Sequence, residues 1–149
     1  MNLFTNKLVL FFSLLLFTIL FYSPVKGFAN VCPQKRNTLT APKEYLEKIN
    51  PLRKEPRHLK KGKVLAQIKA KPLACKQCHG MEGNGNGPMS IHLNPKPRNF
   101  TCSRTMEKIS DGQLFWIIKN GSKGTSMPAY KHLSDKKIWQ LVHYIRSLT

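Results

Sequence analysis

The chain has 149 residues, which is enough for one domain with additional segments. Lysine and arginine outnumber aspartate and glutamate by 25 to 7, giving a formal net charge of +18. This charge favours acidic partners or anionic surfaces, although a basic domain with no specific use for its charge has the same composition. Nucleic acid is not an expected partner, because the chain combines an export signal with no nucleic-acid-binding motif.

Residues 1–29 have the pattern of a signal peptide. Lys7 supplies a positive charge, residues 8–22 are almost entirely apolar, and small residues follow at Gly27 and Ala29. The apolar run is shorter than the roughly 20 residues that a membrane span needs. We therefore expect cleavage after Ala29 and export to the periplasm or an equivalent compartment. The alternative is an uncleaved, slightly longer helix that anchors the protein in the membrane.

Residues 30–61 are predicted to form a proline- and lysine-rich arm that lies against the domain. Four prolines interrupt any long regular element: Pro33, Pro42, Pro51 and Pro56. Between them, residues 42–49 can form one or two helical turns, with Tyr45 as an anchor.

The main domain is expected to span residues 62–149 and to begin with a short amphipathic helix from Gly62. Val64, Leu65 and Ile68 have helical spacing, and Pro72 predicts a bend after them. No strand-like alternation appears in the chain, so the expected fold class is all-α.

Residues 75–79 read Cys-x-x-Cys-His, the attachment pattern of a c-type haem. Cys75 and Cys78 share one face of a helical turn and can bond to one porphyrin, and His79 can then bind its iron. The pattern alone also fits half of a zinc site, a redox dithiol, or a disulfide beside an incidental histidine. The zinc interpretation lacks a second cysteine pair, and the dithiol interpretation lacks a βαβ context.

The remaining chain alternates loops with helices. Residues 80–100 are too rich in glycine and proline for regular structure, and we expect one of their carbonyl groups to accept the Nδ1 hydrogen of His79. Residues 111–120 and 134–148 are predicted helices, the first capped by Ser110 or Asp111 and the second by Ser134. In the first of them, Phe115 and Trp116 are candidates for contact with the porphyrin or for ordinary core.

The iron would have a sixth position to fill, and a methionine thioether there raises the reduction potential. Met127 is the preferred ligand, because it lies in a glycine-bearing loop between two helices and is followed by Pro128. Met89 and Met106 are expected to fill gaps in the core. His132 remains an alternative ligand.

Together the motifs resemble a bacterial class I, monohaem cytochrome c over residues 62–149. The matching segments are Gly62-Lys63, Cys75-x-x-Cys-His79-Gly80, 94–100, 111–121, Met127-Pro-Ala-Tyr130 and 133–148. The resemblance implies an all-α fold in which the first and last helices cross near the edge of one covalently bound haem c. It also implies His79 and Met127 as axial ligands, and electron transfer rather than catalysis.

The predicted function is therefore an exported carrier of single electrons between redox proteins. Exposed lysines around the haem edge would steer encounters with an acidic reductase or oxidase: Lys76, Lys96, Lys123, Lys131, Lys136 and Lys137. The alternatives are a small haem enzyme with an open distal position, and a haem c subunit of a respiratory or multihaem complex, including one associated peripherally with a membrane. Cys32 and Cys102 are left over, and in an oxidising compartment they can form one disulfide.

Overall fold

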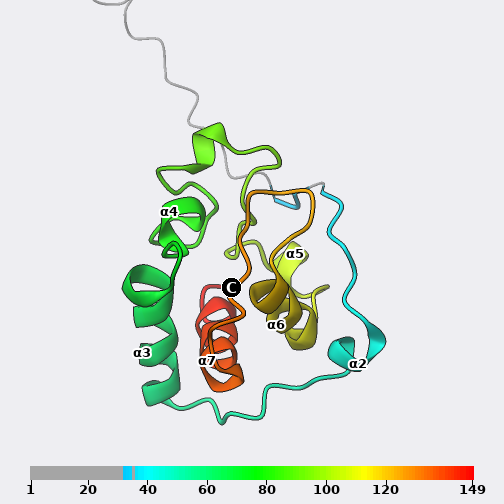
Figure 1. Ribbon diagram of the computed structural model, residues 1–149, viewed down its shortest axis with the longest axis vertical. Helices are drawn as coiled ribbons and strands as arrows, with labels where there is room; N and C mark the ends of the chain where they lie inside the picture. The colour runs from blue at the N-terminus through cyan, green and yellow to red at the C-terminus, as the bar shows by residue number, and fades with distance from the viewer. Residues whose placement is uncertain (1–31, 35) are drawn as a thin grey trace, which may run out of the picture.

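In the computed structural model, described for residues 32–34 and 36–149, every regular element is helical, which confirms the all-α prediction. In chain order the elements are α2 Lys43–Leu46, α3 Pro56–Val64, the π-helical turn η1 Leu65–Lys69, α4 Lys76–His79, the 3₁₀ turn η2 Ser90–His92, α5 Ser103–Met106, α6 Asp111–Asn120 and α7 Asp135–Arg146 (Figure 1). None of these helices combines the length and hydropathy needed to cross a bilayer. The expected signal peptide, residues 1–29, lies outside the described residues.

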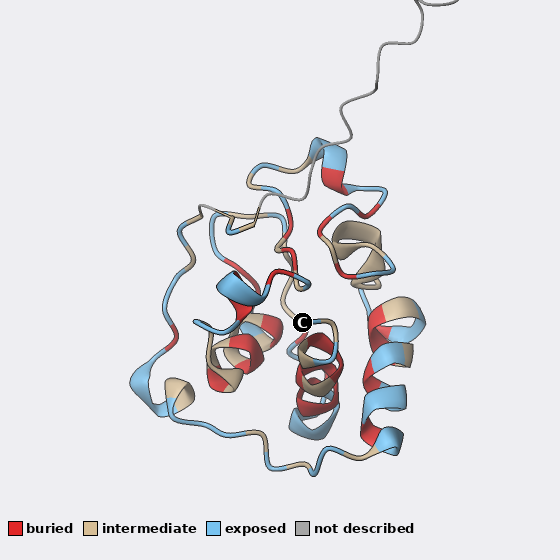
Figure 2. Ribbon diagram, turned by 180° about the vertical axis from the view of Figure 1, so that it is seen from behind, coloured by how far each residue is buried: buried red, intermediate tan, exposed pale blue. Residues whose placement is uncertain are grey.

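Helix α7 is the centre of the core, because α3 packs on one side of it and α6 on the other (Figure 2). The apolar residues of this helix recur at helical spacing, and the stripe that they form is buried along Ile138, Leu141, Val142 and Ile145. From the same spacing Trp139 and Tyr144 are expected to flank the stripe, yet both are buried as well. A helix covered from two sides buries more than one stripe, which explains the difference.

The first and last helices cross at Gly62. A Cβ atom at this position would lie 2.0 Å from the carbonyl oxygen of Gln140 and 2.9 Å from the Cβ of Tyr144. Only a residue without a side chain allows α3 and α7 to approach this closely. The crossing that the family resemblance implied is thus present, and at its centre the backbone of α3 lies against the backbone of α7.

The expected start of the first helix at Gly62 is wrong, because α3 begins at Pro56. Proline is well suited to the first turn of a helix, where its missing N–H has no partner to lose and its φ is already helical. Pro56 therefore starts the helix instead of breaking it. The bend before Cys75 is present: the helix closes with η1, and Ala70 is extended at φ −63° and ψ 134°.

The arm runs along the α5–α6 side of the molecule before the chain crosses to α3 (Figure 1). Its predicted turn is α2, and Tyr45 anchors it as expected, with its ring centroid 6.2 Å from that of Phe115. Gly112 makes this contact close, because a Cβ there would lie 1.6 Å from the Tyr45 carbonyl oxygen. Helix α6 has its predicted bounds and is capped by Ser110, whose hydroxyl accepts the Gln113 N–H.

Candidate haem site

One cavity of about 520 Å³ opens between α4, α6, α7 and the loops that follow α4 and α6. Its volume is in the range of sites for small molecules and cofactors. The four residues selected from the sequence as haem ligands or attachment points all line it: Cys75, Cys78, His79 and Met127. The remaining wall is largely aliphatic, with Leu114 from α6 and Leu141 from α7 among its members.

The two cysteines of the motif are free thiols on one turn, Cys75 as the N-cap of α4 and Cys78 inside it. Burial raises the pKa of the Cys75 thiol to about 11 and also raises the pKa of Cys78. A redox dithiol works through a thiol of lowered pKa, so these cysteines do not suit that role. They suit covalent attachment of a group held in the cavity.

The loop after α4 supplies partners for the carbonyl groups that the short helix leaves unpaired. The N–H groups of Gly85, Gly87 and Met89 donate to the carbonyls of His79, Cys78 and Gln77 at 2.8, 2.9 and 2.8 Å. Gly87 is essential to this wrapping, because a Cβ there would lie 2.4 Å from the Gln77 carbonyl oxygen. The glycines that predicted irregular structure thus hold α4 in place.

The imidazole of His79 is fixed from one side. Its Nδ1 donates to the carbonyl oxygen of Arg98 over 2.9 Å, which confirms the predicted bond to a carbonyl in residues 80–100. The ring of Phe100 stacks on it at 4.4 Å between centroids and 14° between planes. Burial lowers the pKa of His79 to about 4, so the ring is neutral and its Nε2 holds a lone pair, as metal binding requires.

Met127 reaches the cavity from the loop between α6 and α7. Gly121, at φ 77°, ends α6 and begins this loop. Further along, the Met127 carbonyl accepts the Ser122 N–H. The Tyr130 hydroxyl donates to the Leu73 carbonyl over 2.6 Å, so the loop is tied to the segment just before the cysteines. Two segments far apart in the sequence thereby face each other across one site.

The alternative ligand His132, and the remaining histidines and methionines of residues 62–149, lie outside the cavity. His132 and His92 are exposed and line no part of the cavity. His143 contacts the Leu52 carbonyl oxygen at 2.8 Å, on the far side of α7. Met106 is fully buried in the core, as expected, whereas Met89 is 42% exposed, so the prediction that it fills the core is wrong.

Neither aromatic candidate on α6 lines the cavity. Phe115 is buried against Trp139, with ring centroids 4.5 Å apart, and Trp116 lies outside the cavity wall. The aromatic residues that do line it are Phe100 and Tyr130, which sequence reasoning did not assign to the site. The position of Phe100 at the end of the loop expected to wrap His79 is the signal that could have identified it.

The cavity also has a basic, polar part that the sequence did not predict. Arg98 follows Pro97 in the loop, and Arg36, Thr38 and Thr40 come from the arm. A disulfide joins Cys32 to Cys102, with Cα atoms 5.6 Å apart, and attaches this arm to the start of α5. The arm residues carry no recognisable motif, so only the fold reveals them.

These residues fit a haem c. The cavity combines two adjacent free thiols, a neutral histidine with a free nitrogen, a thioether and an apolar wall, which is the donor set of a covalently attached, His/Met-ligated haem. A zinc site does not fit, because no group of three or more His, Cys, Asp or Glu side chains gathers in the described residues.

A comparison with protein families agrees with this site. Residues 58–145 match the family described as "Cytochrome C oxidase, cbb3-type, subunit III". The chain belongs to this family. It is a class I cytochrome c, so the domain carries haem c and takes part in electron transport, either alone or as a subunit of a redox complex. The match begins inside α3 and includes Cys75, Cys78, His79 and Met127, but it excludes residues 30–57 of the arm.

A solved structure is also similar. It is a chain of the "Kuenenia stuttgartiensis reducing HAO-like protein complex Kustc0457/Kustc0458", with 35% sequence identity and a TM-score of 0.58. The similarity covers 66% of this chain and 46% of that one, so our chain spans less than half of the neighbour. A comparison with curated proteins gave no match.

Proposed function

We propose that this protein is an exported cytochrome that carries single electrons between redox proteins. One haem c is attached through Cys75 and Cys78 and ligated by His79 and Met127. The observation that carries the proposal is the presence of all four side chains on the wall of one cavity. The haem supplies the one-electron Fe(III)/Fe(II) couple, and the protein holds it, keeps water away and sets its potential.

Each part of the site has a separate task in this function. The Arg98 carbonyl orients His79 and increases its basicity, and Met127 raises the reduction potential and closes the iron to small substrates. The apolar wall from α6 and α7 lowers the local dielectric, so little solvent reorganises when the charge changes. His79 and Met127 would hold the iron in both oxidation states, so electron transfer would need no bond rearrangement.

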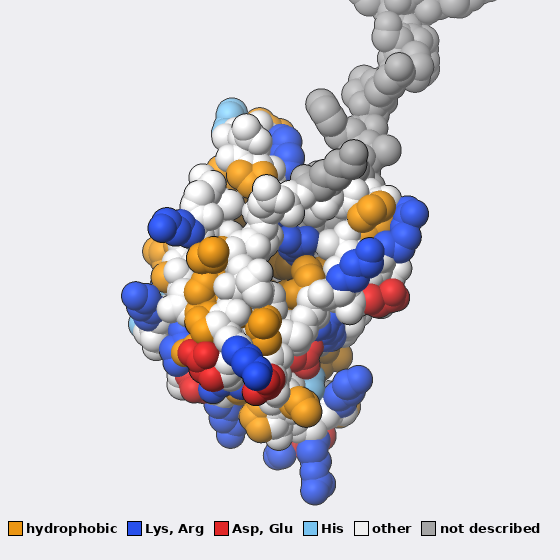
Figure 3. All heavy atoms as spheres, turned by 90° about the vertical axis from the view of Figure 1, so that its right-hand side faces the viewer, with side chains coloured by type: hydrophobic (Ala, Val, Ile, Leu, Met, Phe, Trp, Pro, Cys, Tyr) orange, Lys and Arg blue, Asp and Glu red, His pale blue; other side chains and the backbone are white. Residues whose placement is uncertain are grey.

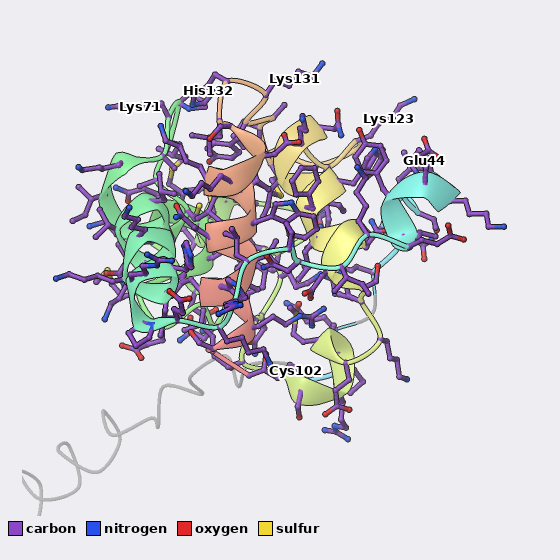
Figure 4. All side chains as sticks on the ribbon, turned by 90° about the horizontal axis from the view of Figure 1, so that it is seen from below. Glu44, Lys71, Cys102, Lys123, Lys131 and His132 are labelled. Carbon is purple, nitrogen blue, oxygen red and sulfur yellow. A yellow bond between two sulfur atoms is a disulfide. The ribbon has the colours of Figure 1, made fainter. Side chains whose placement is uncertain are left out.

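We further propose acidic redox partners. Five of the six lysines expected around the haem edge are exposed, namely Lys96, Lys123, Lys131, Lys136 and Lys137, while Lys76 is half-buried. Figure 3 shows one face of the molecule, over which basic side chains are scattered, while acidic ones gather mainly in its lower part. In Figure 4, Lys71, Lys131 and His132 project from one edge of the molecule, away from Cys102.

The second candidate function is a permanent haem c subunit of a redox complex. The observation that favours it is the similar chain, which comes from a protein complex. The two functions share the site and differ in assembly. Native purification distinguishes them, because a free carrier elutes as a monomer and a subunit elutes with its partner.

The test of the site uses mature protein made in a host that attaches haem c. We expect a haem that stays on the polypeptide under denaturing conditions, a low-spin oxidised spectrum, and the weak far-red band of a thioether–Fe(III) bond. Met127→Ala should remove this band and lower the midpoint potential by about 0.1 V or more. A high-spin wild-type spectrum would instead support the enzyme alternative.

The matched control is Met89→Ala, since Met89 is exposed and outside the cavity. It should keep both the band and the potential. An unchanged spectrum in Met127→Ala would remove Met127 as the ligand, and His132→Ala would then be the next variant to measure. Mass determination of the exported protein tests cleavage after Ala29.

A further inference from the structure

The arm forms part of the cavity wall. Alternate residues Arg36, Thr38 and Thr40 line the cavity, whereas Asn37 and Leu39 between them do not. This alternation is typical of an extended segment, in which successive side chains point to opposite sides. Residues 36–40 of the arm lie outside the family match at residues 58–145 and yet contribute to the site.

Several contacts hold the arm in this position. The Cys32–Cys102 disulfide fixes its start, and Arg104 donates to the Cys32 carbonyl oxygen at 2.7 Å. At its other end, the Gln113 side chain accepts the Ala41 N–H at 2.7 Å and donates to the Leu39 carbonyl at 3.0 Å. Residues 36–41 are therefore held against the cavity.

Gln34 links the arm to the loop that orients His79. Its amide donates to the Pro97 carbonyl at 3.0 Å and accepts the Asn99 N–H at 2.8 Å. These bonds hold the backbone on both sides of Arg98, whose carbonyl oxygen accepts the His79 Nδ1 hydrogen. The arm and the axial ligand are thus parts of one hydrogen-bonded unit.

The charges around this part of the cavity are unbalanced. Arg36, Arg98 and Lys108 line it, and no carboxylate among the described residues does. Arg36 donates through Nη1 to the Lys96 carbonyl, and its Nε is buried without a partner in the described residues. Burial and then the charge of Arg36 lower the pKa of Arg98 to about 10. Arg36 and Arg98 are both half-buried, and two neighbouring, partly desolvated cations are unfavourable unless an anion lies with them.

We propose that the arm is part of the haem-binding site and that Arg36, together with Arg98, binds a propionate carboxylate of the haem. This inference rests on the proposed function. A haem brings two carboxylates into an otherwise apolar cavity, and guanidinium groups pair with carboxylates through two parallel hydrogen bonds. The unpartnered Nε of Arg36 is the donor that such a pair uses.

The experiment compares Arg36→Gln with Arg53→Gln in the haem-loaded protein. Each variant loses one positive charge, but Arg53 is exposed and outside the cavity. At a fixed applied potential, Arg36→Gln should lower the ratio of reduced to oxidised protein about tenfold. For a one-electron couple this corresponds to a midpoint potential lowered by about 59 mV. Arg53→Gln should change this ratio by less than about twofold, because water and salt screen an exposed charge.

The pH dependence of the potential provides a readout that a purely structural role would not change. The titratable and charged protein groups facing this part of the cavity are Arg36, Arg98, Lys108 and His79. Without Arg36 the propionate pKa should rise, so the potential of Arg36→Gln should vary more steeply between about pH 5 and pH 8 than that of wild type. Arg36→Lys should restore most of the wild-type profile.

A second variant frees the arm without touching the arginine. Cys32→Ser with Cys102→Ser should shift the potential in the same direction as Arg36→Gln, since the start of the arm is released. Equal potentials and pH profiles for Arg36→Gln and Arg53→Gln would overturn the inference, whatever the double variant does. If no haem is attached to wild type, the proposed function fails. If haem is attached but Arg36→Gln has the same potential and pH profile as Arg53→Gln, this inference alone fails.

Discussion

His58 is a buried histidine outside the cavity, near the start of α3. Its Nδ1 lies 3.2 Å from the side-chain Nε2 of Gln140 on α7, so the neutral ring accepts this hydrogen bond. Burial, followed by the charge of Arg57, lowers the pKa of His58 below its usual 6.5. The folded protein therefore favours the unprotonated ring, whereas the unfolded chain protonates it near its normal pKa.

This difference predicts a loss of stability in acid. The contribution of neutral His58 is fully present above about pH 6.5 and is lost as the pH falls toward the lowered folded pKa. We expect the melting temperature of wild type to fall between about pH 7.5 and pH 5, and that of His58→Gln to fall less. Parallel melting curves for the two proteins across this range would rule out His58 as a source of the pH dependence.

At the scale of elements, the α3–α7 crossing depends on Gly62. Helix propensity alone predicts that Gly62→Ala stabilises the protein by about 1 kcal/mol. The 2.0 Å approach of a Cβ to the Gln140 carbonyl predicts the opposite sign, because the two helices must separate. We expect a net loss of about 1–3 kcal/mol in the free energy of unfolding.

Chemical denaturation of the haem-loaded protein measures this change. Lys63→Ala is the matched control, since Lys63 is exposed on the same helix, and it should stay within about 0.5 kcal/mol of wild type. Stability in Gly62→Ala equal to or above that of wild type would show that the crossing adapts to a methyl group.

The elements differ in how far the sequence alone could predict them. Helix α6 was predictable to its ends, because Ser110 caps it and Gly121 ends it, and these are local signals. The start of α3 was not, because a proline signals either a break or a first turn, and only tertiary packing decides. The exposure of Met89 likewise follows from the path of a loop, which no local pattern specifies.

The residues of the candidate site also differ in how far the sequence alone could predict them. Cys75, Cys78 and His79 follow from a spacing that chemistry imposes, and Met127 from the position of its loop between two helices. Arg36 lies far from these residues in the sequence, and no spacing rule relates it to the motif. It enters the site only because the arm is held across the cavity, which is a property of the tertiary structure.

At the scale of the whole molecule, the dominant property is the net charge of +18, which cleavage after Ala29 would reduce to +16 by removing Lys7 and Lys26. Such a charge does little for the fold, but it raises the rate of encounter with acidic proteins. The Tyr130–Leu73 hydrogen bond brings the Met127 loop to the segment before Cys75. Lys131 is exposed directly beside this junction, where a partner would approach the site.

We therefore expect the bimolecular rate of reduction by an acidic plant-type ferredoxin to fall steeply with ionic strength.

Lys131→Glu should lower this rate about three- to tenfold at low salt, and the difference should disappear near 1 M salt, where the screening length is about 3 Å. Lys54→Glu makes the same charge change on an exposed residue that does not line the cavity, and it should have a smaller effect. Stopped-flow measurement of the three proteins tests this directly. Rates independent of salt would contradict electrostatic steering, and equal effects of the two variants would show that the net charge matters but not the position of Lys131.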